Sequence, residues 1–255
     1  MATKSASVRT VIVTGASAGI GAGIARRLVS DGYRVVGTYH RGIERIQKLA
    51  REVPGLAIAQ LDTGSADSID TFVASLAGQE IFALVNNAGI VEFEESGVFD
   101  AALWRRVQDV NVEGALSLSL ALRPQFGNPA AIVNIASTDA FLGGVDTMAY
   151  AASKAALISV TKSLALNLGP SIRVNAIAPG WIDTDMGTKL PQMAIENTPL
   201  GRLGTPADIA GIVAFLVSND AAYVTGATIV ADGGYYCLDP VMKAEKLLSD
   251  KGRDV

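Results

Sequence analysis

The chain has 255 residues, of which 49% are hydrophobic and 18% charged, so it can bury a large core and is not a disordered protein. Lys and Arg total 21 against 25 Asp and Glu, and the resulting net charge of −4 argues against nucleic acid or an anionic membrane as the main partner. A single cysteine, Cys237, and a single histidine, His40, exclude an internal disulfide and a Cys/His metal cluster.

Short β-branched runs alternate with longer helical stretches along the chain. We predict strands at Thr10–Thr14, Arg34–Tyr39, Leu56–Leu61, Phe82–Val85, Ala131–Ile135, Arg173–Ala176 and Thr228–Ala231. We predict helices between them at Ile20–Ser30, Ile43–Arg51, Ser68–Ala77, Trp104–Leu122, Tyr150–Leu168 and Ala207–Val217. Strands that read as unbroken apolar runs are typical of a parallel sheet covered by helices. The pattern predicts one α/β domain over residues 1–255, with a doubly wound parallel sheet of about seven strands and helices on both faces.

Two segments lie outside this alternation. Residues 179–206 lack strong periodicity, which predicts a functional loop such as a lid, and residues 235–255 form a polar tail. The first ten residues are polar, and the apolar runs are far shorter than the ~18 residues that span a bilayer. We therefore expect a soluble, cytoplasmic protein with no membrane partner.

A glycine-rich turn follows the first predicted strand. The glycines are Gly15, Gly19 and Gly21, in the spacing G-x-x-x-G-x-G, and a helix follows at once. Glycines let the pyrophosphate of a dinucleotide approach the backbone, and the helix N-terminus offers free N–H groups to the anion. The alternative is a turn whose glycines serve packing alone.

The end of the second predicted strand is where a dinucleotide-binding chain reads the adenosine ribose. Here Tyr39, His40 and Arg41 stand where an acid would bind the ribose hydroxyls of NAD. A cation at this point favours the 2′-phosphate of NADP. We therefore predict NADP as the preferred cofactor, with NAD possible; the alternative is that His40 and Arg41 are solvated polar residues.

Tyr150 and Lys154 lie four residues apart in a predicted helix, so they share one face. The ammonium is expected to lower the pKa of the tyrosine from ~10 toward neutrality, which would make the phenol a general acid or base. A pair with this spacing also arises by chance in many helices.

The order of several motifs is more specific than any one of them. The motifs are Thr14–Gly21, Asn86–Gly89, Asn111 within Asp109–Val112, Ser137, Tyr150–Lys154 and Pro179–Thr184. With them, nearly the whole chain resembles the short-chain dehydrogenase/reductase family, and within it the 3-oxoacyl-carrier-protein reductases and the sugar or polyol dehydrogenases. Enoyl reductases of similar fold place their Tyr and Lys further apart. The resemblance implies a Rossmann-type fold.

The resemblance also implies a role for each matching residue. Tyr150 would exchange the proton with the substrate oxygen, Ser137 would orient that oxygen, and Lys154 would hold the nicotinamide ribose. Asn111 would help to position a water chain. The implied cofactor-binding residues are Gly15, Ser17, Ala18, Gly19, Ile20, Gly21, Tyr39, His40, Arg41, Asp62, Thr63, Asn87, Ala88, Gly89, Tyr150, Lys154, Pro179, Gly180, Ile182 and Thr184.

The function we predict is hydride transfer between NADP(H) and a ketone or secondary alcohol. The alternatives are an NAD-dependent sugar or polyol dehydrogenase, and a non-catalytic cofactor sensor or scaffold of the same fold. We expect a small uncharged carbonyl or alcohol as substrate. Its wall is predicted at Phe141, Leu142 and Val145, capped by Met186 and Leu190.

The helices Trp104–Leu122 and Tyr150–Leu168 carry more apolar residues than one buried face needs. Family members of this kind pair such helices across a two-fold axis. We therefore expect a homo-oligomer, either a dimer or a tetramer.

Overall fold

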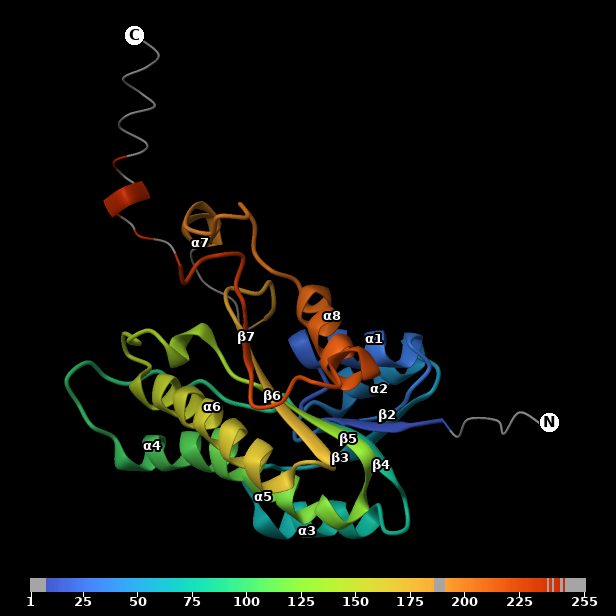
Figure 1. Cartoon of the computed structure of the whole chain (residues 1–255). Coiled ribbons are helices and arrows are strands. Elements are labelled where there is room, and N and C mark those ends of the chain that lie inside the picture. The colour runs from blue at the N-terminus through green and yellow to red at the C-terminus, as the bar shows by residue number, and fades with distance from the viewer. Residues whose placement is uncertain (1–7, 186–190, 238, 240, 244, 246–255) are drawn as a thin grey trace.

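The computed structural model describes residues 8–185, 191–237, 239, 241–243 and 245. The strands are β1 (Thr10–Val13), β2 (Arg34–Tyr39), β3 (Leu56–Gln60), β4 (Ile81–Asn86), β5 (Phe126–Ile135), β6 (Ile172–Pro179) and β7 (Thr228–Ala231). The helices are α1 (Gly19–Ser30), α2 (Ile43–Glu52), α3 (Ala66–Ser75), α4 (Ala101–Gln108), α5 (Gly114–Ala121), α6 (Met148–Leu168), α7 (Pro191–Glu196) and α8 (Pro206–Val217). Strands and helices alternate through most of the chain, as predicted (Figure 1).

The seven strands form one sheet in the order β3-β2-β1-β4-β5-β6-β7, and every neighbouring pair is parallel. Strands β2 and β3 follow one another on one side of β1, and β4 pairs with β1 on its other side. The strand order reverses between β1 and β4, and ligands of open α/β sheets are expected at the carboxyl ends of the strands at such a point. The predicted doubly wound, Rossmann-type sheet is confirmed.

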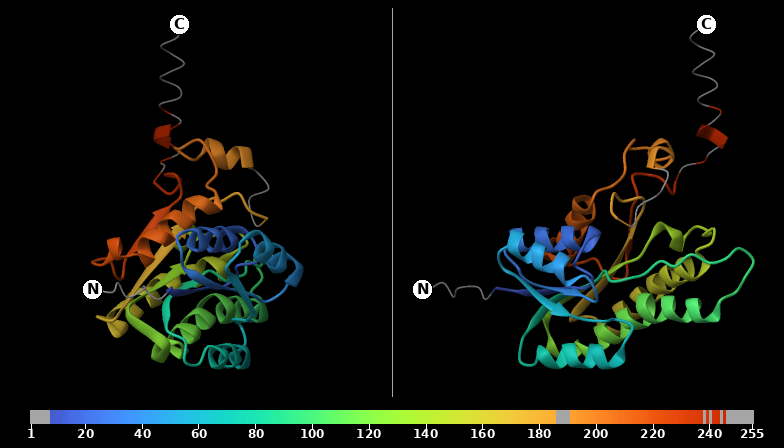
Figure 2. Two further views of the ribbon diagram at one scale, coloured as in Figure 1. Left: turned by 90° about the vertical axis from the view of Figure 1, so that its right-hand side faces the viewer. Right: turned by 180° about the vertical axis from the view of Figure 1, so that it is seen from behind.

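Helices cover both faces of the sheet (Figures 1 and 2). On one face α1, α2 and α8 bury side chains such as Ile24 and Ile209, and on the other α3, α5 and α6 bury side chains such as Leu118 and Leu164. The central strands β1 and β4 are buried along their whole length, whereas the edge strands β3 and β7 are only partly buried. Burial on both faces is why the central strands read as unbroken apolar runs.

The helix predicted over Trp104–Leu122 differs from the structure in two ways. It begins earlier, at Ala101, where the carboxylate of Asp100 accepts the N–H groups of Ala102 and Leu103. It is also interrupted by a π-helical turn over Asp109–Glu113, between α4 and α5. A single π turn is a local feature that an apolar period does not encode, and such turns are frequent at functional sites.

The predicted lid segment 179–206 contains a strand end and a helix, although its sequence shows no strong periodicity. Pro179 is the last residue of β6, which is longer than the predicted Arg173–Ala176, and α7 lies further on. Ile182 forms an isolated bridge with Gly204, so the two ends of the segment lie side by side. Met186 and Leu190 lie outside the described residues.

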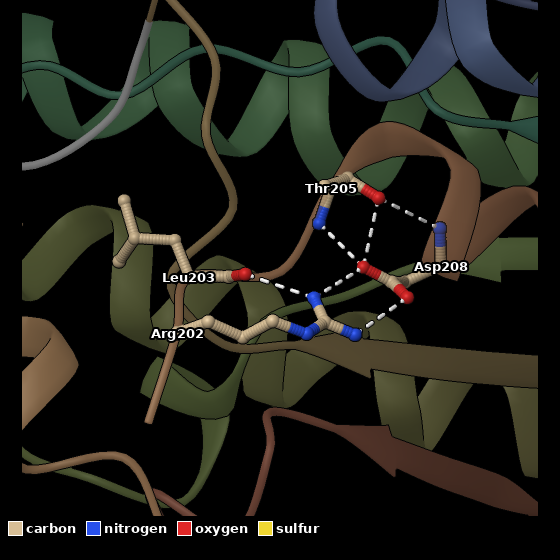
Figure 3. A network of polar contacts seen from close by, with 4 residues as sticks. All are labelled: Arg202, Leu203, Thr205 and Asp208. Carbon is tan, nitrogen blue, oxygen red and sulfur yellow. Dashed lines mark hydrogen bonds and ion pairs between the residues drawn. The ribbon is translucent and has the colours of Figure 1, made fainter. Parts of the chain in front are cut away.

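Helix α8 begins at a network of polar contacts (Figure 3). The Thr205 hydroxyl accepts the Asp208 N–H, and the Asp208 carboxylate accepts the Thr205 N–H at 2.7 Å. The guanidinium of Arg202 donates to both Asp208 oxygens and to the Leu203 carbonyl. This capping box satisfies N–H groups that have no partner inside the helix.

None of the helices in the described part of the chain is long and apolar enough to cross a membrane.

Candidate active site

The glycine loop after β1 is packed too closely for other residues. Gly15 has a φ of +64°, and a Cβ on Gly21 would lie 2.3 Å from the Gly15 carbonyl oxygen. The side-chain amide of Asn87 donates to the carbonyls of Thr14 and Gly15 at 2.9 and 3.1 Å. Gly15 and Gly21 are therefore required by the backbone, and the loop is joined to the segment after β4.

Thr14 makes this junction rigid, a role that the sequence reasoning missed. Its hydroxyl oxygen accepts the N–H groups of Asn87 and Ala88 at 3.0 and 2.9 Å and donates to the Val85 carbonyl at 3.4 Å. Thr14 is itself buried. The available signal was a hydroxyl residue at the end of a buried apolar strand, where a hydrogen-bond partner is required.

The first turn of α1 is open to an anion. Its N-cap residue, Ala18, makes no side-chain hydrogen bond to the turn, and a methyl group of Thr184 lies 3.3 Å from the position a Cβ on Gly19 would take. The loop after β6 therefore reaches across to the glycine loop. The structure brings these two predicted cofactor-binding segments together.

The ends of β2 and β3 also meet. His40 Nε2 lies 3.4 Å from the Asp62 carboxylate, while Arg41 is exposed. Arg45, in the first turn of α2, contacts the Asp185 carboxylate at 3.2 Å. Arg45 is thus a further cation beside the predicted ribose-reading residues, and the sequence reasoning did not single it out.

Tyr150 and Ser137 come from different elements and meet at the same edge of the sheet. Tyr150 lies in the first turn of α6, and Ser137 stands at the start of the short turn that follows β5. Burial raises the pKa of Tyr150 to about 12, against a hydrogen bond with Ser137 that lowers it, and the Asp139 carboxylate raises it further. The expected lowering of the Tyr150 pKa by Lys154 is therefore wrong for the chain alone, because desolvation of the phenolate outweighs the attractive contacts.

Lys154 lies one turn after Tyr150 on α6 and is buried. Its ammonium donates to the Ile135 carbonyl at 2.9 Å and lies 5.5 Å from the centre of the Tyr150 ring. Burial lowers the pKa of Lys154 to about 8, because the charged form loses its hydration. A Cβ on Gly89 would lie 3.3 Å from this ammonium, so Gly89 leaves room for it.

Asn111 lies in the π-helical turn and is buried. Its amide donates to the Ile90 carbonyl at 2.9 Å and to the Ser153 hydroxyl at 3.0 Å, and its oxygen accepts the Ile90 N–H at 2.8 Å. Both N–H donors of the side chain are thus used. Asn111 braces the loop after β4 against α6, and any contact with a water chain would have to involve its oxygen or its main chain.

The loop after β6 contributes Gly180 and Ile182. A Cβ on Gly180 would lie 2.6 Å from Cβ of Asp232, so a side chain there has no room. The side chain of Ile182 is buried in the core beside α8 and β6. Contact between Ile182 and a cofactor would therefore come from its main chain.

Aromatic pairs flank this edge. The rings of Phe141 and Tyr236 lie 5.2 Å apart, and those of Trp181 and Tyr235 lie 6.3 Å apart in an edge-on arrangement. They join the loops after β5 and β6 to the segment after β7. The sequence reasoning named Phe141 but missed both aromatic contacts, because a contact between distant loops leaves no local pattern.

Comparison with known proteins finds relatives over most of the chain. Residues 15–236 match the family model described as enoyl-(acyl carrier protein) reductase. The chain is 38% identical to L-rhamnose 1-dehydrogenase (NAD(P)(+)) of Azotobacter vinelandii, over 89% of this chain and 96% of that protein. It is 34% identical to a 3-oxoacyl-(acyl-carrier-protein) reductase of Staphylococcus aureus, over 89% of this chain and 98% of that protein.

Among solved structures, BdcA in complex with NADPH is 33% identical with a TM-score of 0.83, and the match covers 88% of this chain and 93% of that one. The chain belongs to the short-chain dehydrogenase/reductase family. It is an oxidoreductase that acts on alcohols and ketones with a nicotinamide dinucleotide. A non-catalytic role is thereby disfavoured.

Proposed function

We propose that this enzyme prefers NADP(H) and interconverts a ketone and a secondary alcohol, with Tyr150 as the general acid and base. The observation that carries the proposal is the proximity of Ser137 to the Tyr150 phenol, whose pKa it lowers, with the Lys154 ammonium buried one turn along α6. The three side chains lie at the carboxyl edge of the sheet, where ligands bind in open α/β folds.

The residues at this edge fit the dinucleotide. Gly15 and Gly21 leave no space for side chains, and the uncapped start of α1 offers N–H groups and the positive end of a helix dipole to a pyrophosphate. When bound, the nicotinamide supplies or accepts the hydride. The proposed contacts are the cofactor-binding residues predicted from the sequence, with Pro179, Gly180, Ile182 and Thr184 on the nicotinamide side.

The chain's own residues manage the proton. With a pKa of about 12, the Tyr150 phenol stays protonated at neutral pH, which suits donation to a carbonyl oxygen during reduction. The Ser137 hydroxyl orients the same oxygen. The Lys154 ammonium is a second acid close to the Tyr150 ring, because its pKa of about 8 lies close to neutrality.

The exposed apolar and aromatic side chains in the loops after β5 and β6 favour an uncharged substrate. Phe141 and Leu142 are each 39% exposed, and Trp181 is exposed to the same extent. Apolar and aromatic walls of this kind bind carbon frameworks and leave orientation to a few polar groups. The four-residue Tyr–Lys spacing favours carbonyl chemistry over enoyl reduction. Because one relative is named a rhamnose dehydrogenase, sugar oxidation with NAD or NADP is the second candidate.

Replacing Tyr150 by phenylalanine tests the chemical proposal. The variant keeps the ring but loses the proton donor, so we expect ketone reduction to fall by at least about 100-fold, the low end for a general acid. NADPH binding should remain measurable by fluorescence titration. A Tyr150→Phe enzyme with near-wild-type turnover would show that another group transfers the proton.

Replacing Arg41 by alanine tests the cofactor preference. If its guanidinium meets the 2′-phosphate, the dissociation constant of NADPH should rise by about tenfold and that of NADH should change little. Arg34→Ala is the matched control, since Arg34 is an exposed arginine at the opposite end of β2. A wild-type enzyme that binds NADH more tightly than NADPH would refute the preference.

A further inference from the structure

The start of α6 is held by a carboxylate from a distant loop. Its N-cap residue, Thr147, makes no side-chain capping bond. Instead Glu94, in the loop between β4 and α4, accepts the N–H of Met148 on one carboxylate oxygen at 2.8 Å and the N–H of Ala149 on the other at 2.7 Å. These N–H groups have no partner inside the helix, and a negative charge there also complements the helix dipole.

The main chain of Glu94 holds Asp146, which lies two residues before the first residue of α6. Its N–H donates to the Asp146 carbonyl at 2.8 Å. Asp146 has a φ of 56° and is the one non-glycine residue in the described part of the chain with a positive φ. A strained conformation of this kind persists only where its surroundings enforce it. Glu94 therefore fixes both the end of the loop after β5 and the first turn of α6.

The clamped residues adjoin the reacting side chain. Tyr150 follows Ala149 directly, and Gln108 of α4 donates a further hydrogen bond to the Ala149 carbonyl at 3.0 Å. Ser137 belongs to the turn that follows β5 and not to α6. The separation of the two hydroxyl groups therefore depends on where the first turn of α6 lies, and Glu94 contacts that turn through both carboxylate oxygens.

We propose that Glu94 is a positioning residue, whose carboxylate clamps the first turn of α6 and so sets the place of the Tyr150 phenol relative to Ser137 and the substrate oxygen. The inference rests on the proposed function, because it takes Tyr150 as the proton donor. Glu94 itself does not touch the reacting atoms. A misplacement of about 1 Å can cost about 100-fold in rate, so a clamp of this kind controls turnover.

The same loop offers a matched control. Glu92, two residues before Glu94, also uses its carboxylate, but its partner is Arg106 of α4, at 2.6 Å. Glu92→Gln therefore weakens an ion pair on the loop and leaves the bonds to Met148 and Ala149 in place.

The experiment compares Glu94→Ala, Glu94→Gln and Glu92→Gln with the wild type. Steady-state kinetics use NADPH with the better of two ketones, ethyl acetoacetate and cyclohexanone. NADPH affinity is measured by fluorescence and folding by circular dichroism. We expect kcat to fall by about 10- to 100-fold in Glu94→Ala and by less in Glu94→Gln, which keeps one acceptor oxygen. The NADPH dissociation constant should stay within about twofold, and Glu92→Gln should keep its kcat.

Several outcomes would overturn the proposal. A folded Glu94→Ala with wild-type kcat would do so, since a clamp that only stabilises the fold lowers the melting temperature and leaves turnover of the folded enzyme unchanged. An equal loss in Glu92→Gln would also do so. If Glu94→Ala does not fold, Glu94→Gln decides alone: a wild-type kcat overturns the proposal and a reduced kcat with unchanged NADPH affinity supports it.

The failure of this inference is distinguishable from failure of the proposed function. An inactive Tyr150→Phe together with fully active Glu94 variants would overturn the clamp only. A fully active Tyr150→Phe, or a wild type that binds NADPH and reduces neither ketone, would overturn both.

Discussion

The charge of Asp139 opposes ionisation of the Tyr150 phenol. Asp139 follows Ser137 by two residues, and its N–H donates to the Ser137 hydroxyl oxygen at 3.1 Å. Burial raises the pKa of Asp139 itself, and its carboxylate raises that of Tyr150. The Lys154 ammonium lies 5.5 Å from the centre of the Tyr150 ring. Of these two charged groups, only Asp139 shifts the pKa of Tyr150.

Replacing Asp139 by asparagine should lower the pKa of Tyr150, because the phenolate then forms without a neighbouring negative charge. Alcohol oxidation needs the phenolate as base, so the alkaline rise of log kcat should move to lower pH, by up to about one unit for a partly screened carboxylate. The measurement is the pH profile of alcohol oxidation. Glu95→Gln, at an exposed acid on another loop, should leave the profile in place. A shift of the Asp139→Asn profile to higher pH would contradict the assigned sign.

At the scale of elements, the start of α8 secures the end of the segment after β6. Asp208 accepts hydrogen bonds from Arg202 and from the main chain and hydroxyl of Thr205. The Arg202 guanidinium, followed by the Thr205 contacts, holds the pKa of Asp208 well below its usual value. The ionised form is thus bound more favourably in the folded chain than in the unfolded one.

Asp208→Asn should lower the free energy of unfolding by about 1 kcal/mol at neutral pH, a capping contribution limited by the exposure of the pair. A depressed folded-state pKa stabilises the fold above the unfolded value of about 3.9 and ceases to do so as pH falls toward the folded value. The difference between variant and wild type should therefore shrink below about pH 4. Urea unfolding at several pH values measures it, with Asp220→Asn as the control for simple loss of charge. A difference that grows on acidification would refute the linkage.

At the scale of the whole molecule, the apolar surplus on the helices is mostly used within one chain. Leu118 and Leu164 are buried against the sheet, whereas Leu120 is 46% and Leu166 is 86% exposed. Only a few exposed apolar side chains on these helices are therefore left to pair with a second copy of the chain. The homo-oligomer stays a prediction, and it now rests on these exposed leucines.

The parallel sheet explains why residues far apart in the chain form one site. Every strand delivers its carboxyl end to the same edge, so the loops after β1, β4 and β5 meet although Gly15 and Lys154 are separated by most of the domain. Among the contacts that hold the edge together, the Thr14 hydroxyl joins β1 to the segment after β4, and the Lys154 ammonium joins α6 to β5. The topology brings the groups together, and these polar contacts fix their geometry.

Much of the architecture was predictable from the chain. Seven apolar runs and the helical periods between them indicated the sheet, because burial on both faces leaves a direct trace in the sequence. The glycine loop and the Tyr–Lys pair were recognisable for the same reason: each depends on spacing within one local segment. The predicted site residues lie around one edge, and their roles remain proposals.

Only the tertiary structure decided the rest. The raised pKa of Tyr150, the π turn around Asn111 and the Glu94 clamp depend on desolvation and on contacts between segments that are distant in sequence. Such contacts have no period and no fixed spacing along the chain. Local residue types determined which elements form and which chemistry is available, whereas the packing of those elements determined how the phenol is held and how readily it ionises.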